Sequence, residues 1–326
     1  MEDVTDAAFR RLIARHGKPH VLFSEFTSAD GLVLAPESGR SHLRRKLLYS
    51  EEERPIVAQL FSAIPERMEK TASIVREMGF DGIDINMGCP DRAIERGLCG
   101  AAMMRNPALA REVIRAAKRG WEGRTGMRVR LANLCESDSH TLSPRNAIKP
   151  TLPISVKTRI GYTRNELETW LPVLLGEGLA AITIHARTRD EMSDVPAHWE
   201  TIQQAVAIRD ALGSSALIVG NGDVKNLTDA RTKAAETGCD GVMLGRAIYG
   251  NPWLFAEHTP SSRERVEALI EHLHLFDELL GDMVNYATMK KHFKAYVSGW
   301  DGAKELRARL METGHAGEAI KILKTS

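Results

Sequence analysis

Short apolar segments alternate with longer amphipathic stretches along most of the chain. The apolar segments have the length and composition of single buried strands, and in the stretches between them apolar residues recur at helical spacing. We expect strands over residues 21–26, 55–61, 82–86, 154–159, 181–186, 216–220 and 241–244. We expect helices over residues 7–13, 65–78, 107–118, 165–177, 199–211 and 227–237. After residue 252 the strand pattern stops, and helical spacing continues over residues 263–280, 283–297 and 302–323.

Strands that alternate with helical stretches of about a dozen residues predict βαβ units and a parallel sheet. The pattern contains seven strand–helix units, and a closed TIM barrel has eight. Because the chain opens directly on what reads as a loop after a strand, we expect the missing strand to lie before Met1. We therefore predict an α/β fold, a TIM (β/α)8 barrel with a truncated first strand over residues 1–255, and a small helical domain over residues 256–326. Residues 119–153 lack clear periodicity and are expected to form an insertion in the barrel.

Composition limits the classes of protein to which this chain can belong. Of 326 residues, 43% are hydrophobic and 27% are charged, as in soluble globular domains. No apolar run is long enough to span a bilayer, and the N-terminus lacks a signal-peptide pattern. Four irregularly spaced cysteines form no zinc-binding set, so we expect a cytoplasmic protein with reduced thiols and no metal. With a net charge of +1, a polyanionic partner would need a local basic surface.

Polar residues cluster at the C-terminal ends of the predicted strands. In a β/α barrel this face carries the active site, because the strand ends and the loops that follow them meet there. The period of two along a strand places Lys157 and Arg159 on one face of their strand, and His185 and Arg187 on one face of the next. The candidate residues at this face are Gln59, Asn86, Cys89, Lys157, Arg159, His185, Arg187, Asn221, Asp223 and Arg246.

The segment over residues 82–90 begins as a strand and ends in residues that disfavour one. Ile83 and Ile85 alternate with polar residues, whereas Gly88 and the proline after Cys89 interrupt the strand. This arrangement would display Cys89 at the catalytic face, where a thiol can act as a general acid. Taken alone, the segment is equally consistent with a turn that buries a small cysteine.

Two glycine-containing loops follow the last two predicted strands. Asn-Gly-Asp at residues 221–223 and Gly-Arg at residues 245–246 stand where this fold commonly binds phosphate. Each is also consistent with an ordinary turn, but two on consecutive strands favour a phosphate site. The chain has no GxGxxG motif after a first strand and no P-loop, which disfavours a Rossmann or kinase-like nucleotide site. A phosphate here, with Gln59 and Lys157 lining the mouth, suits a bound FMN.

The segment from Asp84 to Pro90, Asp-Ile-Asn-Met-Gly-Cys-Pro, resembles the signature of the tRNA-dihydrouridine synthases, in particular the bacterial B type. Other segments match motifs of the same family in order, and an ordered set is more specific than any one motif. They are Met-Glu-Asp-Val-Thr-Asp at residues 1–6, Val-Ala-Gln-Leu at 57–60, Gly-Ala-Ala-Met-Met at 100–104, Val-Lys-Thr-Arg-Ile-Gly at 156–161, Ile-His-Ala-Arg-Thr-Arg at 184–189, Asn-Gly-Asp at 221–223 and Gly-Arg-Ala at 245–247. The similarity extends from Met1 to about residue 255.

The resemblance implies an FMN-dependent enzyme that uses NADPH to reduce selected uridines of tRNA to 5,6-dihydrouridine. It also implies that Cys89 is the general acid that protonates uracil C5. The positions that match FMN contacts in the family are Met1, Gln59, Lys157, His185, Asn221, Gly222, Asp223, Gly245 and Arg246. Those that match positions near the target uracil or the RNA are Asn86, Arg159 and Arg187. The family usually begins with a strand that ends Leu-Ala-Pro-Met, and this chain starts at the equivalent methionine.

Two other functions are compatible with the sequence. One is an FMN barrel that acts on a free pyrimidine, similar to dihydroorotate dehydrogenase, and the other is a non-catalytic tRNA-binding relative. The predicted C-terminal helices argue against the first, because they carry a basic cluster that could contact an RNA backbone. The cluster consists of Lys290, Lys291, His292, Lys294 and Tyr296. Taken alone, it is better explained as an ordinary solvated helix face.

Overall fold

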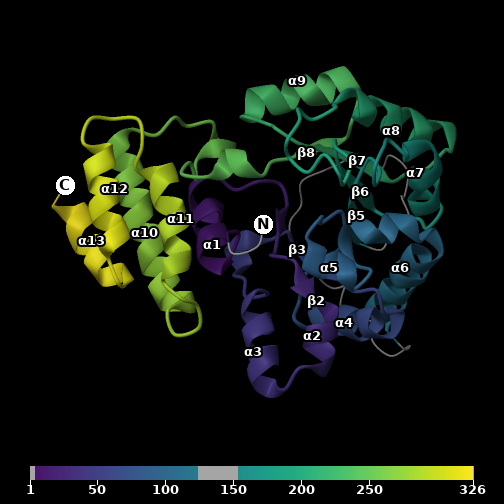
Figure 1. Ribbon diagram of the computed structural model, residues 1–326, viewed down its shortest axis with the longest axis horizontal. Coiled ribbons are helices and arrows are strands. Elements are labelled where there is room, and N and C mark those ends of the chain that lie inside the picture. The colour runs from purple at the N-terminus through teal and green to yellow at the C-terminus, as the bar shows by residue number, and fades with distance from the viewer. Residues whose placement is uncertain (1–3, 124–152, 326) are drawn as a thin grey trace, which may run out of the picture.

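A curled sheet of parallel strands forms the centre of the molecule, of which the computed structural model describes residues 4–123 and 153–325 (Figure 1). The strands are β1 (Leu22–Phe23), β2 (Thr27–Ser28), β3 (Ile56–Phe61), β4 (Gly82–Met87), β5 (Ile154–Arg159), β6 (Ala181–His185), β7 (Leu217–Asn221) and β8 (Gly241–Met243). Their order is β1-β3-β4-β5-β6-β7-β8, and β2 also pairs with β3. Every pair is parallel, so the C-terminal strand ends gather at one face.

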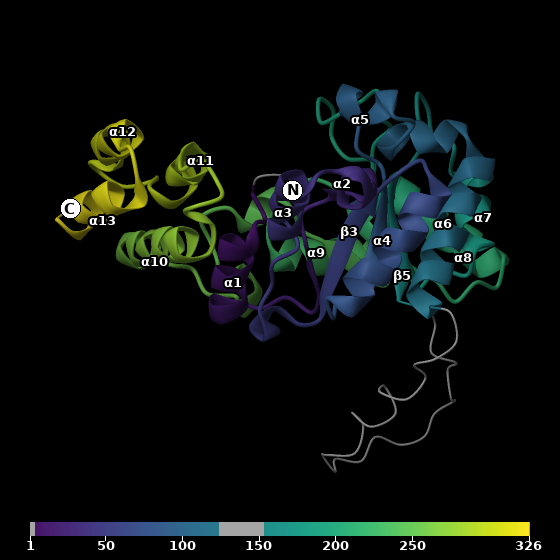
Figure 2. The ribbon, with the colours of Figure 1, turned by 90° about the horizontal axis from the view of Figure 1, so that it is seen from below.

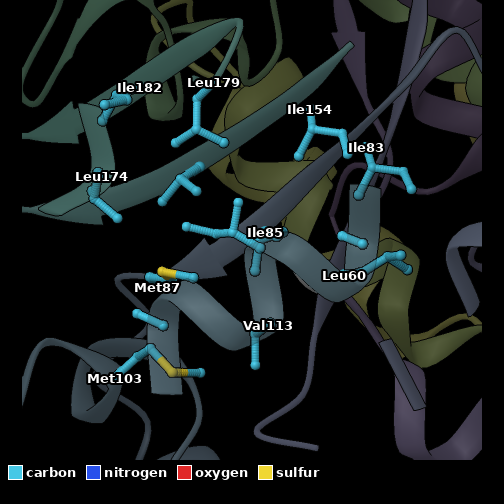
Figure 3. Packing of buried hydrophobic residues seen from close by; sticks show 14 of the residues in the cluster. Leu60, Ile83, Ile85, Met87, Met103, Val113, Ile154, Leu174, Leu179 and Ile182 are labelled. Carbon is cyan, nitrogen blue, oxygen red and sulfur yellow. The ribbon is translucent and has the colours of Figure 1, made fainter. Parts of the chain in front are cut away.

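Helices cover the outer face of this sheet, as Figures 1 and 2 show. They are α2 (Ala29–Leu34), α4 (Pro65–Glu77), α6 (Pro107–Glu122), α7 (Leu167–Leu175), α8 (Glu200–Ala211) and α9 (Leu227–Thr237). Ile83, Ile85 and Met87 of β4 belong to the same apolar core as Val113 of α6 (Figure 3). The polar residues between them therefore face the interior of the barrel, because successive strand residues point to opposite faces. The predicted TIM-like parallel barrel is confirmed.

The last part of the chain forms a helical unit beside the barrel (Figure 1). It contains α10 (Ser262–Leu280), α11 (Ala287–Tyr296), α12 (Ala303–Glu312) and α13 (Ala316–Lys324). Helix α1 (Ala7–His16) lies between this unit and the barrel in both views. Ala8 and Leu12 of α1 pack in the same apolar core as Leu269 and Phe293. The N-terminal helix is therefore shared by both parts of the molecule.

Two close backbone approaches fix the joint between the barrel and the helical unit. Gly250 has φ +68° and lies so near α11 that an added Cβ would stand 2.2 Å from the Ala295 carbonyl oxygen. At Gly17, after α1, an added Cβ would stand 2.7 Å from the Pro252 carbonyl oxygen. A side chain at either position would require the backbone to shift. The segment that leaves β8 is therefore held between α1 and α11.

Some boundaries differ from those that the sequence pattern predicts. The strand expected over residues 21–26 is shorter in the structure, where β1 covers only Leu22–Phe23 and a separate strand, β2, begins after the expected range, at Thr27. Between them, Gln59 N–H donates to the Ser24 hydroxyl, at 3.1 Å, and not to a backbone carbonyl. The polar stretch over residues 36–54 contains two unpredicted elements, α3 (Glu37–Arg45) and the short helix η1 (Glu51–Glu53). The helix expected over residues 302–323 is two helices, α12 and α13.

The predicted insertion begins later than residue 119, because α6 continues to Glu122. At Gly120 an added Cβ would stand 2.0 Å from the Glu69 carbonyl oxygen. This glycine therefore permits α6 to approach α4 closely, and it does not end the helix. The rest of the predicted insertion, residues 124–152, lies outside the described residues.

Candidate active site

The register of the sheet places the predicted residues beside one another at the C-terminal ends of the strands. Residues that pair across parallel strands point to the same side of the sheet, so paired polar side chains line the same interior surface. The pairs are Gln59 with Asp84, Asn86 with Lys157, Arg159 with His185, and His185 with Asn221. The sheet thus brings together polar groups from β3, β4, β5, β6 and β7.

Cys89 lies just beyond the end of β4, in a loop whose backbone is fixed by hydrogen bonds. Asn86 Oδ1 accepts hydrogen bonds from the N–H groups of Gly88 (3.1 Å) and Cys89 (3.0 Å). The Cys89 carbonyl accepts one from Ala101 N–H at 2.9 Å. At Gly100, which has φ +60°, an added Cβ would stand 2.5 Å from that carbonyl. The half-buried thiol is therefore carried on a backbone held at both its N–H and its carbonyl.

A buried carboxylate, that of Asp84, lies close enough to Lys157 for their charges to interact. Asp84 is fully buried and accepts hydrogen bonds from Ser155 Oγ (2.6 Å) and Gln59 Nε2 (2.7 Å). Burial raises the pKa of Asp84, although these two bonds act in the opposite direction. Burial, followed by the nearby charge of Arg159, lowers the pKa of Lys157 to about 8. Within the described part of the chain, no acceptor is hydrogen-bonded to Lys157 Nζ.

Arg159 and Arg187 are buried and hold the loops at the mouth of the barrel. Arg159 Nε donates to the Gly88 carbonyl at 2.9 Å, and its Nη1 donates to the Thr188 carbonyl at 2.7 Å. Burial lowers the pKa of Arg159 to about 10. Arg187 Nε donates to the Val195 carbonyl at 2.6 Å. Arg159 thus connects its strand end to two loops that are distant in the sequence, whereas Arg187 Nε closes the loop that follows its own strand.

His185 is a neutral histidine at the centre of this charged surface. Burial lowers its pKa well below the usual value, and the charges of Lys157 and Arg159 act in the same direction. Its Nε2 lies 3.5 Å from Arg187 Nη1, whereas its buried Nδ1 has no hydrogen-bond partner among the described residues. A neutral imidazole can donate at one nitrogen and accept at the other, so this ring has capacity for a ligand.

The loops after β7 and β8 meet at the carboxylate of Asp223. It accepts hydrogen bonds from Arg246 Nη2 at 2.8 Å, from Ala197 N–H at 3.0 Å and from Arg187 Nη2. Burial acts to raise the pKa of Asp223, but the bonds from Ala197 and Arg187 outweigh it and the pKa is lowered. Arg246 begins the short helix η4 (Arg246–Ile248), and its side chain is 68% exposed. Asp223 therefore orients two arginines, a contact that the sequence did not predict.

Gly222 permits a close approach to Ala197 where the chain turns out of β7. It has φ +133°, and an added Cβ would stand 2.8 Å from Ala197 Cβ and 3.8 Å from His185 Nε2. Its carbonyl accepts a hydrogen bond from Trp199 Nε1 at 2.9 Å. Gly245 immediately precedes η4 as its N-cap residue. Both predicted loop glycines thus stand at turns beside the polar surface.

Most of the predicted site residues come together at this face, and one important residue was missed. Met1 lies outside the described residues. Asp84 was missed, although the sequence carries a signal for it. A lone carboxylate stands between Ile83 and Ile85, on the opposite face of an otherwise apolar strand. Such a residue in a parallel barrel points into the interior.

The other predicted chemical groups are less accessible. Cys99 and Cys239 are buried, and burial raises the pKa of Cys99 to about 11. Cys135 lies outside the described residues. The expected basic cluster of α11 is only partly exposed, because His292 and Tyr296 are buried at 1% and 0% exposure. These two residues therefore cannot contact RNA, and the interpretation of them as part of an RNA-binding cluster is wrong.

None of the helices in the described part of the chain combines the length and the apolar character that a membrane span requires.

Comparison with known proteins gives matches along nearly the whole chain. The model of the family described as Dihydrouridine synthase (Dus) matches residues 1–142 and 139–325. A Bacillus subtilis (strain 168) protein named probable tRNA-dihydrouridine synthase 2 is 36% identical over 327 residues, covering 99% of this chain and 91% of the relative. A Staphylococcus aureus (strain COL) protein named probable tRNA-dihydrouridine synthase is 36% identical over 329 residues, covering 99% and 90%. Histamine dehydrogenase from Rhizobium sp. 4-9 is similar in fold alone, with a TM-score of 0.53 at 14% identity, over 84% of this chain and 46% of that chain.

Proposed function

This chain belongs to the dihydrouridine synthase family, which makes it an oxidoreductase, and on that premise we propose that it reduces selected uridines of tRNA to 5,6-dihydrouridine. We propose FMN as its bound cofactor and NADPH as its reductant. The observation that carries the proposal is the position of Cys89 at a strand end, close enough to Lys157 and Arg159 for their charges to interact with it. Incubation of the purified protein with unmodified tRNA and NADPH tests it, and tRNA without dihydrouridine would refute it.

The groups at the barrel mouth fit FMN. His185 Nδ1 is buried without a hydrogen-bond partner among the described residues, and Lys157 Nζ is a further donor beside it. Both suit the polar edge of an isoalloxazine ring, where a lysine stabilises negative charge. Gly222 has no side chain between the turn after β7 and the His185 ring, and Arg246 offers an exposed guanidinium to a phosphate. Gln59, Asn221, Asp223 and Gly245 complete the proposed cofactor set among the described residues.

The hydride that adds to uracil C6 would come from bound FMN that NADPH has reduced. The negative charge left on the base is neutralised when C5 receives a proton, and the Cys89 thiol is the proposed donor. Asn86 holds the donor in place, because its side chain binds the N–H groups of Gly88 and Cys89. The nearby positive charges stabilise the thiolate that remains, which solvent then reprotonates. We assign Asn86, Arg159 and Arg187 to the substrate side of the site, where the two arginines shape the loops.

Arg246→Ala should weaken FMN binding, because a hydrogen bond to a charged group contributes about 1.5–3 kcal/mol. The dissociation constant for FMN should therefore rise by roughly tenfold to a hundredfold. Flavin absorbance after dialysis measures the effect. Arg231→Ala is the matched control, since Arg231 is 64% exposed and also pairs with one carboxylate, that of Glu257. Equal flavin retention in the two variants would remove Arg246 from the phosphate site.

We propose that the helical unit contacts tRNA through Lys291 and Lys294 of α11, which are both exposed. Lys290 is less available, because its ammonium donates to the Met311 carbonyl at 2.7 Å. A target base inside folded tRNA must be unstacked, which costs a few kcal/mol. Contacts to phosphates elsewhere on the tRNA can offset that cost, and such contacts weaken as the salt concentration rises.

Replacing both exposed lysines in the variant Lys291→Glu/Lys294→Glu should raise the KM for tRNA by roughly tenfold at low salt, with a smaller effect at high salt. NADPH oxidation by the bound flavin should not change, because it does not involve RNA. Steady-state kinetics at two salt concentrations provide the measurement. Lys304→Glu/Lys324→Glu is the control, because it reverses the charge of two other exposed lysines of the same helical unit. If both double variants have the same KM, the α11 lysines serve solubility and not RNA binding.

Experiments on the same purified protein also test the two alternative functions. An enzyme for a free pyrimidine would turn over that substrate and leave tRNA unreduced. A non-catalytic tRNA-binding relative would bind tRNA, lack flavin absorbance and form no dihydrouridine. Purified protein that carries flavin and acts only on tRNA would exclude both.

A further inference from the structure

The helix that follows Cys89 has little apolar anchoring. Helix α5 (Arg92–Arg96) has five residues, none of them buried, and Asp91 caps its N-terminus. Only Ile94 packs partly against the barrel core. Figure 2 shows α5 at one end of the barrel, away from the outer helices α4, α6 and α8. Because so short a helix is not stable alone, its position depends on contacts with the rest of the barrel.

The strongest of these contacts is an ion pair between Glu95 of α5 and Arg189 in the loop after β6. Arg189 Nε lies 2.9 and 3.0 Å from the two carboxylate oxygens, and Nη2 also donates to the carboxylate. The Glu95 and Arg189 side chains are only 9% and 21% exposed. A bidentate pair that is largely shielded from water is stronger than an exposed surface pair.

Arg189 is itself held by the loop after β5. Its guanidinium lies over the Tyr162 ring at 5.4 Å from the centroid. Its backbone N–H donates to the Gly161 carbonyl at 2.9 Å. The ion pair therefore fastens α5 to two loops that are already in contact with each other. These loops follow β5 and β6, the strands that carry Lys157 and His185.

We propose that the Glu95–Arg189 ion pair positions the Cys89 loop for proton transfer. The backbone bonds of Cys89 fix the base of this loop, and Arg159 joins the base to the loop after β6 through the Gly88 and Thr188 carbonyls. The ion pair fixes the far end, on α5. Cys89 thus lies between Gly88 and Glu95, and both of these residues are connected to the loop after β6. The inference rests on the proposed role of Cys89.

Glu95→Gln removes one charge with little change in volume, and Arg189→Lys keeps the charge but loses the two-pronged geometry. In each variant the rate at saturating tRNA should fall by roughly tenfold to a hundredfold, because displacing a reacting group by about 1 Å lowers the rate by a factor of that size. FMN content should not change. The rate of Cys89 alkylation by iodoacetamide, followed by mass spectrometry of its peptide, should increase because the loop opens more often.

The double variant Glu95→Gln/Arg189→Lys tests whether the two residues act as a pair. Residues of one contact are non-additive, so the double variant should be no slower than the slower single variant. Glu267→Gln is the control, because Glu267 is an exposed partner of Arg263 on α10, at 2.9 Å. It should leave the rate, the FMN content and the alkylation of Cys89 as in the unmodified protein.

Three results would overturn the inference. They are an unchanged rate and alkylation in the single variants, a fall in rate that follows loss of FMN, and a double variant in which the two defects multiply. Failure of the proposed function gives a different result. If Cys89→Ala kept its activity while Glu95→Gln still accelerated alkylation, Cys89 would not be the proton donor, yet the ion pair would still position its loop.

Discussion

Cys89→Ala should lose dihydrouridine formation by roughly two to four orders of magnitude, the usual effect of removing a general acid. The main-chain N–H and carbonyl of Cys89 are held by the Asn86 side chain and by Ala101 N–H, so replacing the Cys89 side chain should not displace the loop. FMN should stay bound, and NADPH should still reduce it, because neither step needs the thiol. Mass spectrometry of the tRNA measures dihydrouridine formation. Consumption of NADPH in the absence of tRNA measures reduction of FMN separately.

Cys99→Ala provides the matched control for this experiment. The Cys99 thiol is buried, lies 3.3 Å from the Gly97 carbonyl oxygen, and has its pKa raised to about 11 by burial. A buried, weakly acidic thiol is a poor proton donor, so this variant should react at close to the unmodified rate. If Cys99→Ala lost activity and Cys89→Ala kept it, the assignment of Cys89 would be wrong, although family membership would be unaffected.

Arg10→Met should lower the free energy of unfolding by about 3–5 kcal/mol, because it leaves a buried carboxylate without its charge partner. The side chains of Arg10 and Glu53 are 1% and 0% exposed, with Arg10 Nε 2.8 Å from Glu53 Oε2. Arg10 also donates to the Thr5 carbonyl at 2.6 Å and to the Leu48 carbonyl. The loss is a large part of a typical stability of about 5–15 kcal/mol. Chemical denaturation monitored by circular dichroism measures it.

The double variant Arg10→Met/Glu53→Gln should recover much of this loss, because it leaves no unpaired buried charge. The glutamine could still accept the hydrogen bond that Glu53 Oε1 receives from Ser50 N–H at 2.8 Å. Glu52→Gln is the control, since Glu52 is 54% exposed and pairs with Arg15 at 3.2 Å, and it should cost about 0–1 kcal/mol. Equal destabilisation by Arg10→Met and Glu52→Gln would mean that the buried pair does not anchor α1.

Much of the barrel could be predicted because its strands are short apolar runs bounded by residues that interrupt them. The strand Ile154–Arg159 and the helix Leu227–Thr237 have the expected bounds. Helix α3 could not be predicted in the same way, because it buries no residue and so carries no apolar stripe. The end of α6 was misjudged because Gly120 is a close-packing residue in the fold but resembles a helix end in the sequence.

The site was predictable where it depends on the fold, and unpredictable where it depends on contacts between distant loops. Residues at strand ends such as Lys157 and His185 converge because all the strands are parallel. The ion pair of Glu95 with Arg189 joins positions 94 residues apart, so no local sequence pattern predicts it.

The burial of His292 and Tyr296 could have been predicted from their spacing. Together with Met289 and Phe293, they occupy positions i, i+3, i+4 and i+7 of α11, and all four side chains are buried. This spacing is that of the inward face of an amphipathic helix.

The sharing of α1 between the two parts of the molecule has a consequence for building chimaeras. Besides Ala8 and Leu12, which pack among the C-terminal helices, His16 Nε2 lies 2.6 Å from Glu271 Oε2 and Arg15 Nη1 lies 3.2 Å from Glu271 Oε1. A graft that exchanged only the C-terminal helices with those of a relative would set these side chains against a foreign surface. An exchange meant to redirect the protein to another RNA must therefore transplant α1 together with the C-terminal helices, so that the surfaces that pack against one another move as one module.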